Sequence, residues 1–542
     1  MLFVPFVFGK KMKKLSFLSR ITLLLGFFFT LDKLLGFLRV IIIARAFNLS
    51  FQLDAFNAAD ILPTLLTALI SGEALSMAFI PILTQTLTLR GREAAWDLFS
   101  RVVNLAFIIT GAMSLIAAVF ADPIVRMWIT PGFTAEQQHI VSLLMRLDLI
   151  AAVIFSISGL VVGGLQANEH FLLPALAPIL YNVGQIFGAA ILAPAAPLHL
   201  GPITLPAFNL GVYGLAYGVI LGAALHLLIQ IPALVRYGFR WTPSIKINDP
   251  AMIASLKVIG PRVVTVLFVQ LMFVTRSSLG SMLGQTGAIT SLIYGWMIME
   301  VPETLLGTAI ATAMLPTLSE YAARADWSGF RQTMEKAIQV LIALSLPAGA
   351  IIAAGIHPIL RAAFHFDEAG TDLLTFTTRI YMLTLCGYAL QEVAARAFYA
   401  RKEALIPLAT AAVRLLIYLV IGVSGLIFFK SIGAPVIALA ELSLTVEAIV
   451  MLIILNHRMQ EPIKIDGVLL KGLVAALFGG GAAYVLAAML PGSALITAIL
   501  GMIIGTIIAL VIVQKEVRLF LKLGKDENAE SNKTVEYNNR HV

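Results

Sequence analysis

Long runs of apolar residues, separated by short polar turns, dominate the chain. About fourteen of them reach the roughly 20 residues that an α-helix needs to cross the hydrocarbon core of a bilayer. The runs cover residues 20–46, 55–84, 96–121, 138–164, 172–194, 209–235, 252–282, 286–316, 335–356, 371–400, 405–428, 432–455, 467–489 and 493–514. This pattern predicts an all-α integral membrane protein with about fourteen transmembrane helices.

The composition supports a membrane location. Of the 542 residues, 59% are hydrophobic and only 13% are charged, and the mean hydropathy is +0.93. A soluble domain carries about 25% charged residues. A soluble protein of this length could not cover its surface with so few charges, so lipid must cover most of it.

The basic residues are concentrated in alternate turns. The net charge is +8, but Lys and Arg gather before the first run, after the second, sixth, eighth, tenth and twelfth runs, and after the last run. This is the distribution of cytoplasmic loops in membrane proteins, and it gives no reason to expect nucleic acid as a partner. We therefore expect a basic cytoplasmic N-terminus (1–19), starting at Met1 or Met12, and a polar cytoplasmic tail (515–542).

Two parts of the chain repeat each other. Segments 61–85 and 300–322 share the order Pro, Thr, Leu-Leu, a stretch of small residues and a second Pro, and LQANEHFLLP (165–174) matches FYARKEALIP (398–407). The offset is about 235 residues in both comparisons. This predicts two six-helix lobes (20–236 and 251–456) related by a pseudo-twofold axis, followed by two extra helices (467–514). Transporters of this plan bind substrate between their halves.

Polar residues interrupt several apolar runs. A charge at the bilayer centre costs about 2.5–3.5 kcal/mol on insertion scales, so such residues usually face a cavity or a partner. The candidates are Asp32, Lys33 and Arg39 in the first run, Asp60, Thr64, Thr67 and Ser71 on one face of the second, Arg262, Gln270 and Arg276 in the seventh, and Glu300 in the eighth. The roles of Arg146, Asp148, Arg414 and Glu441 stay open.

The cations of the first run suggest a cavity for an anionic headgroup. Phosphate or pyrophosphate would bind Lys33 and Arg39 through charge-assisted hydrogen bonds. Two structural alternatives remain. Asp32 can form an ion pair with Lys33 or Arg39, and the threonine hydroxyls can bond back to their own helix.

The sequence lacks the common motifs of enzymes. It has no GxxxxGK[ST] loop, no HExxH and no Cys/His cluster for zinc. Gly479, Gly480 and Gly481 lie in a predicted helix and indicate close helix packing. We therefore expect a transporter without a cofactor, which works among membrane lipids and is driven by the membrane potential, Na⁺ or H⁺.

Several segments together resemble the MurJ/MviN family within the MATE-like (MOP) exporter superfamily. They are LLGFLRVIIIARAF (34–47), LDAFNAADILPTLL (53–66), SMAFIPIL (76–83), MEVPETLLGTAIATAMLPTLS (299–319) and FYARKEALIP (398–407). The resemblance covers about residues 15–515. It implies a flippase of the bacterial cytoplasmic membrane that moves lipid II, an undecaprenyl-pyrophosphate-linked peptidoglycan precursor, to the outer leaflet by alternating access. Arg39 matches the family's GFxR arginine, Asp54 its DAF aspartate and Glu300 the glutamate before its helix 8 proline.

The chain departs from the family pattern at cavity positions. Lys33 stands where an arginine is usual, Val40 replaces an acidic residue, and Thr67 and Met297 stand where arginines are expected. Two alternatives therefore stay open: a flippase for another polyprenyl-linked glycan, and a multidrug or metabolite exporter of the same superfamily with an acidic cavity. A polyprenyl-sugar transferase would need longer loops, and a scaffold would not need paired polar stripes.

Overall fold

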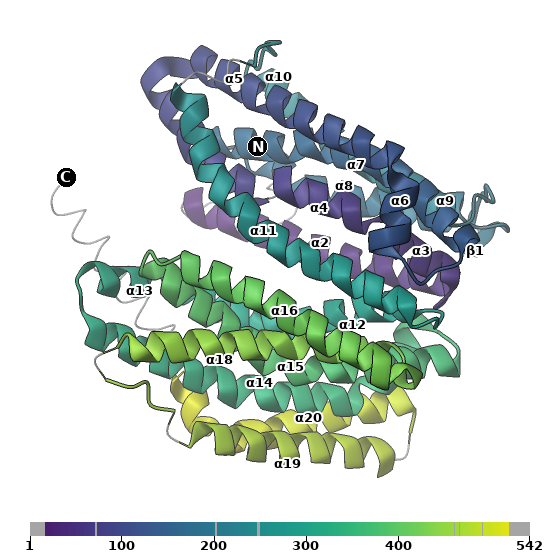
Figure 1. Cartoon of the computed structure of the whole chain (residues 1–542), viewed down its shortest axis with the longest axis vertical. Coiled ribbons are helices and arrows are strands. Elements are labelled where there is room, and N and C mark those ends of the chain that lie inside the picture. Colours follow the sequence, from purple (N-terminus) through teal and green to yellow (C-terminus); the bar gives the residue numbers. More distant parts are fainter. Residues whose placement is uncertain are drawn as a thin grey trace. The chain divides into compact units, whose positions relative to one another are not determined.

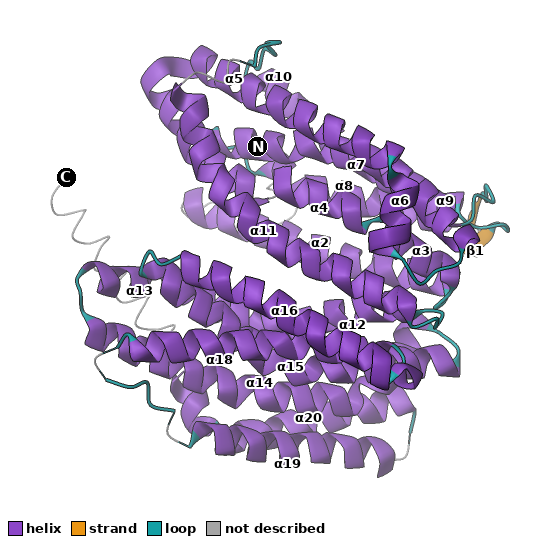
Figure 2. Ribbon diagram, in the orientation of Figure 1, coloured by secondary structure: helices purple, strands orange, loops and turns teal. Residues whose placement is uncertain are grey.

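The computed structural model of the protein consists of helices, apart from one pair of short β-strands among the described residues (Figure 2). The described residues are 17–70, 73–200, 203–245, 250–459, 461–465, 467–489 and 492–519. The chain divides into two compact units, residues 1–278 and 279–542. Segments 61–85 and 300–322, which match in the predicted repeat, belong to different units.

Unit 1 contains the helices that the sequence predicts for the first lobe, and most of the helix that follows it. They are α2 (Phe17–Phe47), α3 (Phe51–Ala59), α4 (Ile61–Ile70), α5 (Glu73–Val119), α6 (Ala121–Ile124), α7 (Ala135–Ala167), α8 (Leu172–Phe187), α9 (Val212–Leu228), α10 (Ile231–Arg236) and α11 (Pro250–Met282). Two π-helical turns, Val125–Ile129 and Gly188–Leu192, follow α6 and α8. Strands β1 (Leu198–Leu200) and β2 (Ile203–Leu205) pair antiparallel.

Unit 2 contains the remaining helices, most of which are labelled in Figure 1. They are α12 (Ala288–Glu303), α13 (Ala309–Ala323), α14 (Trp327–Phe364), α15 (Glu368–Ala400), α16 (Leu405–Phe428), α17 (Ala434–Ala438), α18 (Leu442–His457), α19 (Val468–Met489) and α20 (Ala494–Ile512). A π-helical turn, Thr304–Thr308, joins α12 to α13, and 3₁₀ turns at Lys430–Ile432 and Leu439–Glu441 flank α17.

Local polar residues determine where several helices begin. Thr134 and Gln137 form a capping box at the start of α7, in which each side chain accepts a hydrogen bond from the other residue's backbone N–H. Asp326 and Asp367 accept backbone N–H bonds at the starts of α14 and α15. These side chains satisfy N–H groups that have no partner within the helix.

Eleven helices among the described residues are long and apolar enough to cross a membrane. The protein is therefore an all-α, multi-pass membrane protein. Three predicted runs, 20–46, 55–84 and 252–282, are not among these eleven. The first carries Asp32, Lys33 and Arg39 in its middle, the second is divided among three helices, and only Val266–Met282 of the third qualifies, as a shorter apolar helix.

The prediction of one helix over residues 55–84 was wrong. Helix α3 ends at Ala59, α4 begins at Ile61, and α5 begins at Glu73. Asp60 lies at the junction, and its backbone N–H bonds to Phe56 and Ala58 at the end of α3. Helix α5 then continues past the predicted turn, with a kink at Gly91, whose φ of 83° suits a residue without a side chain.

In unit 1, α7 packs against α3, α4, α5 and α9, and α8 packs against α2 and α9. Helices α8 and α9 approach each other through glycines. A Cβ on Gly184 would lie 2.4 Å from Gly222 Cα, and a Cβ on Gly188 would lie 2.7 Å from Gly218 Cα. Small residues allow this close backbone approach between membrane helices.

We expect Gly184→Ala to destabilise the protein by about 1–3 kcal/mol, because the new methyl group overlaps the backbone of α9. The readout is the midpoint of thermal unfolding of the purified protein in detergent. Gly481→Ala is the matched control, since no atom lies within 4 Å of the Cβ position of Gly481. It should leave the midpoint unchanged or raise it, because alanine favours a helix over glycine by about 1 kcal/mol. Equal midpoints for the two variants would contradict the packing.

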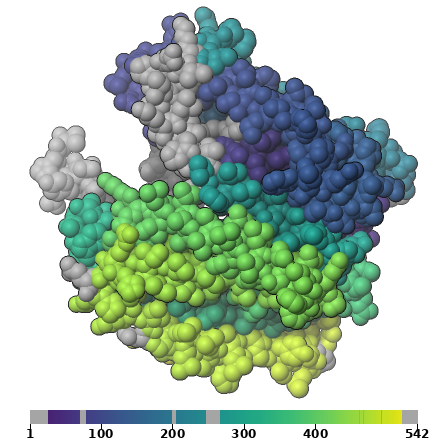
Figure 3. Space-filling view, viewed as in Figure 1, coloured from purple at the N-terminus to yellow at the C-terminus, as the bar shows by residue number. Residues whose placement is uncertain are grey.

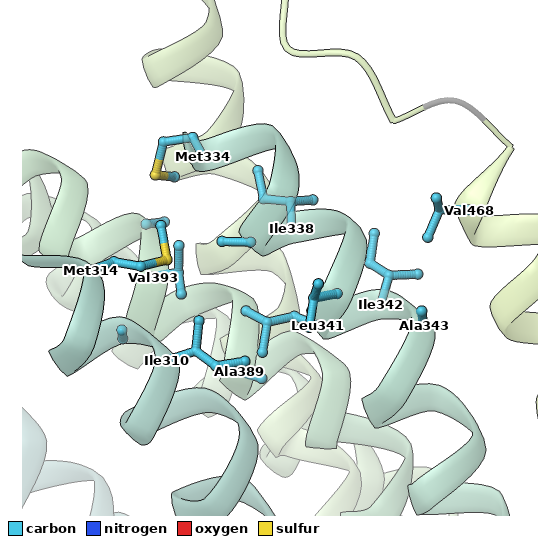
Figure 4. Close-up of a cluster of buried hydrophobic side chains, with 14 of the residues drawn as sticks. Ile310, Met314, Met334, Ile338, Leu341, Ile342, Ala343, Ala389, Val393 and Val468 are labelled. Atoms are coloured by element: carbon cyan, nitrogen blue, oxygen red, sulfur yellow. The ribbon is translucent and has the colours of Figure 1, made fainter. Parts of the chain in front are cut away.

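In unit 2, α14 packs against α15, α19 and α20, and α15 also packs against α12 and α18. Figure 4 shows part of the apolar core, where side chains of α13, α14 and α15 meet around Met314, Met334, Leu341 and Val393. In Figure 3, the yellow side chains of the last helices lie directly against the rest of this unit.

The three glycines of α19 have different surroundings. A Cβ on Gly479 would lie 2.9 Å from the Gly505 carbonyl oxygen of α20, and one on Gly480 would lie 3.1 Å from Ala350 Cβ of α14. Close packing is therefore confirmed at these two positions. It was wrong for Gly481, which faces open space.

Candidate functional site

Helices α2 and α8 bring the first polar residues of the site together. Asn182 of α8 donates a hydrogen bond from Nδ2 to Asp32 Oδ1 at 2.9 Å. Its neighbour Tyr181 lies under the Arg39 guanidinium, whose Cζ is 5.9 Å from the ring centroid. Asp32 and Arg39 are seven residues apart and share a face of α2, so this face is directed toward α8. Among the described residues, Asp32 forms no ion pair and its hydrogen-bond partner is the Asn182 amide, so the predicted ion-pair alternative was wrong.

Arg39 is half-buried and forms no ion pair with any described residue. Its Nε atom is buried and has no hydrogen-bond acceptor within the part of the chain that the structure describes. Asp60 lies close enough to Arg39 for the opposite charges to attract. One Asp60 oxygen, Oδ2, accepts a hydrogen bond from Thr64 Oγ1 at 3.0 Å. The helix break at residue 60 thus places a carboxylate near the cation of α2.

Asp148 of α7 belongs to the same group of side chains. It is 1% exposed, and neither carboxylate oxygen has a hydrogen-bond partner in the described chain. Its charge interacts with that of Asp60, and the charges of both interact with the Tyr181 hydroxyl. Helix α7 packs against α3 and α4, the two helices on either side of Asp60. We call Arg39, Asp60, Asp148 and Tyr181 the polar cluster.

The remaining predicted residues of the first half lie outside the polar cluster. Lys33 is exposed and forms no ion pair or hydrogen bond with a described residue, and helix geometry places it on another side of α2 than Arg39. Thr67 donates its hydroxyl hydrogen bond to the Pro63 carbonyl of its own helix at 2.9 Å, as the second structural alternative predicts. Asp54 is buried at 2% exposure on α3. Ser71 lies outside the described residues.

Charged residues of α7 differ in their surroundings. Two residues before Asp148, Arg146 donates from Nη2 to Asp122 Oδ2 at 2.8 Å and from Nε to the Ala118 carbonyl at 3.0 Å. Asp122 lies on α6, outside the apolar spans. The hydrogen bond from Arg146 holds the pKa of the Asp122 carboxyl below its usual range.

Helix α11 carries three of the predicted residues. Gln270 is half-buried, and Arg276 is buried, with its guanidinium 4.9 Å from the centroid of the Phe273 ring. Arg262 lies in α11, but its side chain is not among those described. The grouping of Arg262, Gln270 and Arg276 with Arg39 stays a prediction.

In unit 2, the region matching Asp60 is also acidic and irregular. Glu300 is exposed near the end of α12, whereas Glu303 is buried at 1% exposure. Both oxygens of Glu303 accept the Thr308 hydroxyl hydrogen bond at 3.2 Å, across the π-helical turn. Gly307 makes room for this carboxylate, because a Cβ there would lie 2.4 Å from Glu303 Oε1. The two units thus share a carboxylate and a threonine at a helix irregularity.

Further polar residues of unit 2 are paired with one another. Arg414 of α16 contacts Glu441 at 3.0 Å and Glu447 of α18 at 3.6 Å, all in the buried interior. Glu392 and Arg396 form an ion pair at 3.1 Å along α15. Each of these two arginines thus has at least one carboxylate partner within unit 2.

The sequence analysis missed Asn182 and Tyr181 and assigned no role to Asp148. An asparagine within an otherwise apolar run was the available signal for Asn182, since such residues usually bond to another membrane helix. Nothing in the sequence indicated which face of α7 meets Asp60. Chemically, the polar cluster offers one guanidinium with a vacant donor, which suits an anion, and two nearby carboxylates, which suit a proton or a cation.

Comparison with known sequences points to a single family. A family model described as lipid II flippase MurJ matches residues 43–519. The chain is 29% identical over 433 residues to the lipid II flippase MurJ of Burkholderia cenocepacia, which covers 77% of this chain and 79% of that protein. It is 25% identical over 420 residues to a probable lipid II flippase MurJ of Vibrio cholerae, which covers 75% of this chain and 77% of that protein.

Solved structures agree at the level of the fold. The chain resembles a lipid II flippase MurJ in an inward closed conformation, with a TM-score of 0.74 at 19% identity, over 92% of this chain and 100% of that one. It also resembles an inward-facing multidrug resistance MATE family transporter of the MOP superfamily, with a TM-score of 0.63 at 14% identity, over 79% and 94% of the two chains.

Proposed function

Because the chain belongs to the lipid II flippase MurJ family, we propose that it carries lipid II from the inner to the outer leaflet of the bacterial cytoplasmic membrane. The undecaprenyl tail stays in the bilayer, and the pyrophosphate headgroup moves by alternating access. Both termini lie in the cytoplasm, as the positions of the basic residues favour.

One observation supports the headgroup site above all: Arg39 lies within the membrane helix α2 with a vacant Nε donor and no ion pair among the described residues. An arginine fork matches two phosphate oxygens, and such charge-assisted bonds are about twice as strong as neutral ones. Lys33 adds a second positive charge on the same helix. Asp32, Asp60 and Thr64, which belong to the same unit, position or balance these cations.

The membrane potential supplies a driving force for this movement. An inside-negative potential favours outward transfer of an anion by roughly 2.3 kcal/mol per charge per 100 mV. Electrical driving suits a carrier whose headgroup is a pyrophosphate.

Complementation tests the proposed substrate. We expect the chain to restore growth in a strain depleted of its own lipid II flippase, where an empty vector does not. A multidrug or metabolite exporter would instead leave the strain inviable and lower its accumulation of soluble drugs. A flippase for another polyprenyl-linked glycan would also fail to rescue, and would flip that glycan in reconstituted vesicles. Absence of growth with the protein present in the membrane at normal levels would therefore refute lipid II as the substrate.

A further inference from the structure

Asp148 has the surroundings of a carboxyl group that holds a proton. It is 1% exposed on the membrane helix α7, and no described residue donates a hydrogen bond to either of its oxygens. Transferring an isolated ionised carboxylate from water into an apolar medium costs so much that the group normally takes up a proton instead. Ionisable residues inside membrane proteins commonly serve as proton sites.

Asp60 gives a second reason to expect a proton on Asp148. Its carboxylate lies near enough to repel a negative charge on Asp148. Two carboxylates at close range in a buried site do not both ionise readily. The Thr64 hydroxyl donates a hydrogen bond to the Asp60 carboxylate, and the positive charge of Arg39 attracts this carboxylate. Asp148 has neither a hydrogen-bond donor nor a neighbouring cation among the described residues. Asp60 is therefore the member that ionises first, and Asp148 is the member that keeps the proton.

The helices around α7 carry the groups that could compete for the charge of Asp148. Helix α2 contributes Arg39 and α8 contributes Tyr181, the cluster members described above. On α9, His226 bonds to Ser158, ten residues further along α7, at 2.6 Å. Residues 102–119 of α5 include no charged side chain.

The helices near the other end of α7 hold the remaining charges. Asp122 of α6 is bonded to Arg146, Arg126 lies exposed in the following π-helical turn, and Asp54 of α3 is buried. Among the described groups, Arg39 is thus the cation that attracts the Asp60 carboxylate, and no described cation offsets a charge on Asp148.

We propose that Asp60 and Asp148 form a proton-binding site that sets the charge beside Arg39, so that protons and the lipid-linked pyrophosphate bind together. The identity of the anion rests on the proposed function, whereas the proton site does not depend on it. With both carboxylates ionised, the net charge of the three groups is negative and repels an anion. One proton makes the group neutral, and a second makes it positive.

Thermodynamic linkage makes the effect reciprocal. If protons raise the affinity for the anion, the bound anion raises the affinity for protons by the same factor. Binding of lipid II should therefore weaken as the pH rises, by up to about tenfold per pH unit for each proton taken up. The proton acts as a charge-balancing ligand of the site while the headgroup is bound.

Infrared spectroscopy of the full-length protein in nanodiscs, without substrate, tests the proton site directly. Protonated carboxyl groups have a carbonyl stretching band that carboxylates lack. We expect this band at neutral pH, and we expect Asp148→Asn to remove intensity from it. Asp122→Asn is the matched control. Because Arg146 keeps the pKa of Asp122 low, this carboxyl is already ionised and its loss should not change the band. Identical bands in wild type and Asp148→Asn would overturn the proposal.

The linkage between protons and anion is tested by measuring the affinity for purified lipid II between pH 6 and pH 8.5, a range of roughly two and a half units. The pyrophosphate diester of lipid II keeps its charge over this range. The wild type should lose affinity as the pH rises, and Asp60→Asn/Asp148→Asn should bind with an affinity that does not depend on pH. Wild-type affinity that is flat with pH would overturn the linkage. A protonated Asp148 in a protein that binds no lipid II at any pH would refute the proposed function and leave the proton site standing.

Discussion

Replacing Arg39 with alanine is expected to reduce lipid II flipping by about a hundredfold or more. Removing one partner of a desolvated, hydrogen-bonded charge pair costs about 2–5 kcal/mol, and each 1.4 kcal/mol corresponds to about a tenfold change. The vacant Nε donor of Arg39 is the group that would bond the pyrophosphate. The measurement is the rate at which reconstituted vesicles expose fluorescent lipid II on their outer leaflet.

Two variants of the same helix separate chemistry from folding. Arg39→Lys keeps the positive charge but lacks the planar fork, so it should retain part of the activity. Arg45→Ala removes an exposed arginine six residues further along α2, and we expect it to flip lipid II at close to the wild-type rate. Wild-type flipping by Arg39→Ala, at equal reconstitution, would exclude Arg39 from the headgroup site.

Replacing Arg414 with alanine is expected to destabilise the protein by about 3–5 kcal/mol. The side chains of Arg414, Glu441 and Glu447 are 10%, 0% and 2% exposed, and the guanidinium contacts both carboxylates. Its loss would leave two buried negative charges uncompensated. We expect the thermal unfolding midpoint to fall by several degrees and the fraction of monodisperse protein to drop in detergent.

The physical cause can be tested by removing the carboxylates as well. A triple variant with Arg414→Leu, Glu441→Leu and Glu447→Leu should recover most of the stability, because well-packed apolar residues often replace a buried ion network without loss. Arg324→Ala is the surface control. Its partner Glu320 and Arg324 itself are largely exposed, so we expect little change. Equal stability of Arg414→Ala and Arg324→Ala would show that the buried network contributes nothing.

The structure offers a physical explanation for one departure from the family pattern. The sequence lacks the acidic residue usual at position 40, where Val40 stands beside Arg39. Asp60, at the break between α3 and α4, supplies a carboxylate within electrostatic reach of Arg39 instead. A negative partner for the arginine is thus present, contributed by another segment.

The sequence alone determined most of the long apolar helices and the family. Apolar length and flanking charges are local properties, so the predicted run 405–428 has the same bounds as α16, and 467–489 differs from α19 by one residue. Helical periodicity is also local, and it places Asp32 and Arg39, seven residues apart, on one face of α2. Glu392 and Arg396 are four residues apart on α15, a spacing that allows the ion pair they form.

Only the tertiary structure decided which face of each helix packs against which other helix. Asp32 bonds to Asn182, 150 residues away, and Asp148 meets Asp60 because α7 packs on α3 and α4. Arg414 and Glu441 had no assigned role until α16 and α18 placed them together. An apolar run states that a helix will be buried in lipid or protein, but its neighbours depend on the packing of the small and large side chains of several helices at once. That packing cannot be predicted from the sequence of any one segment.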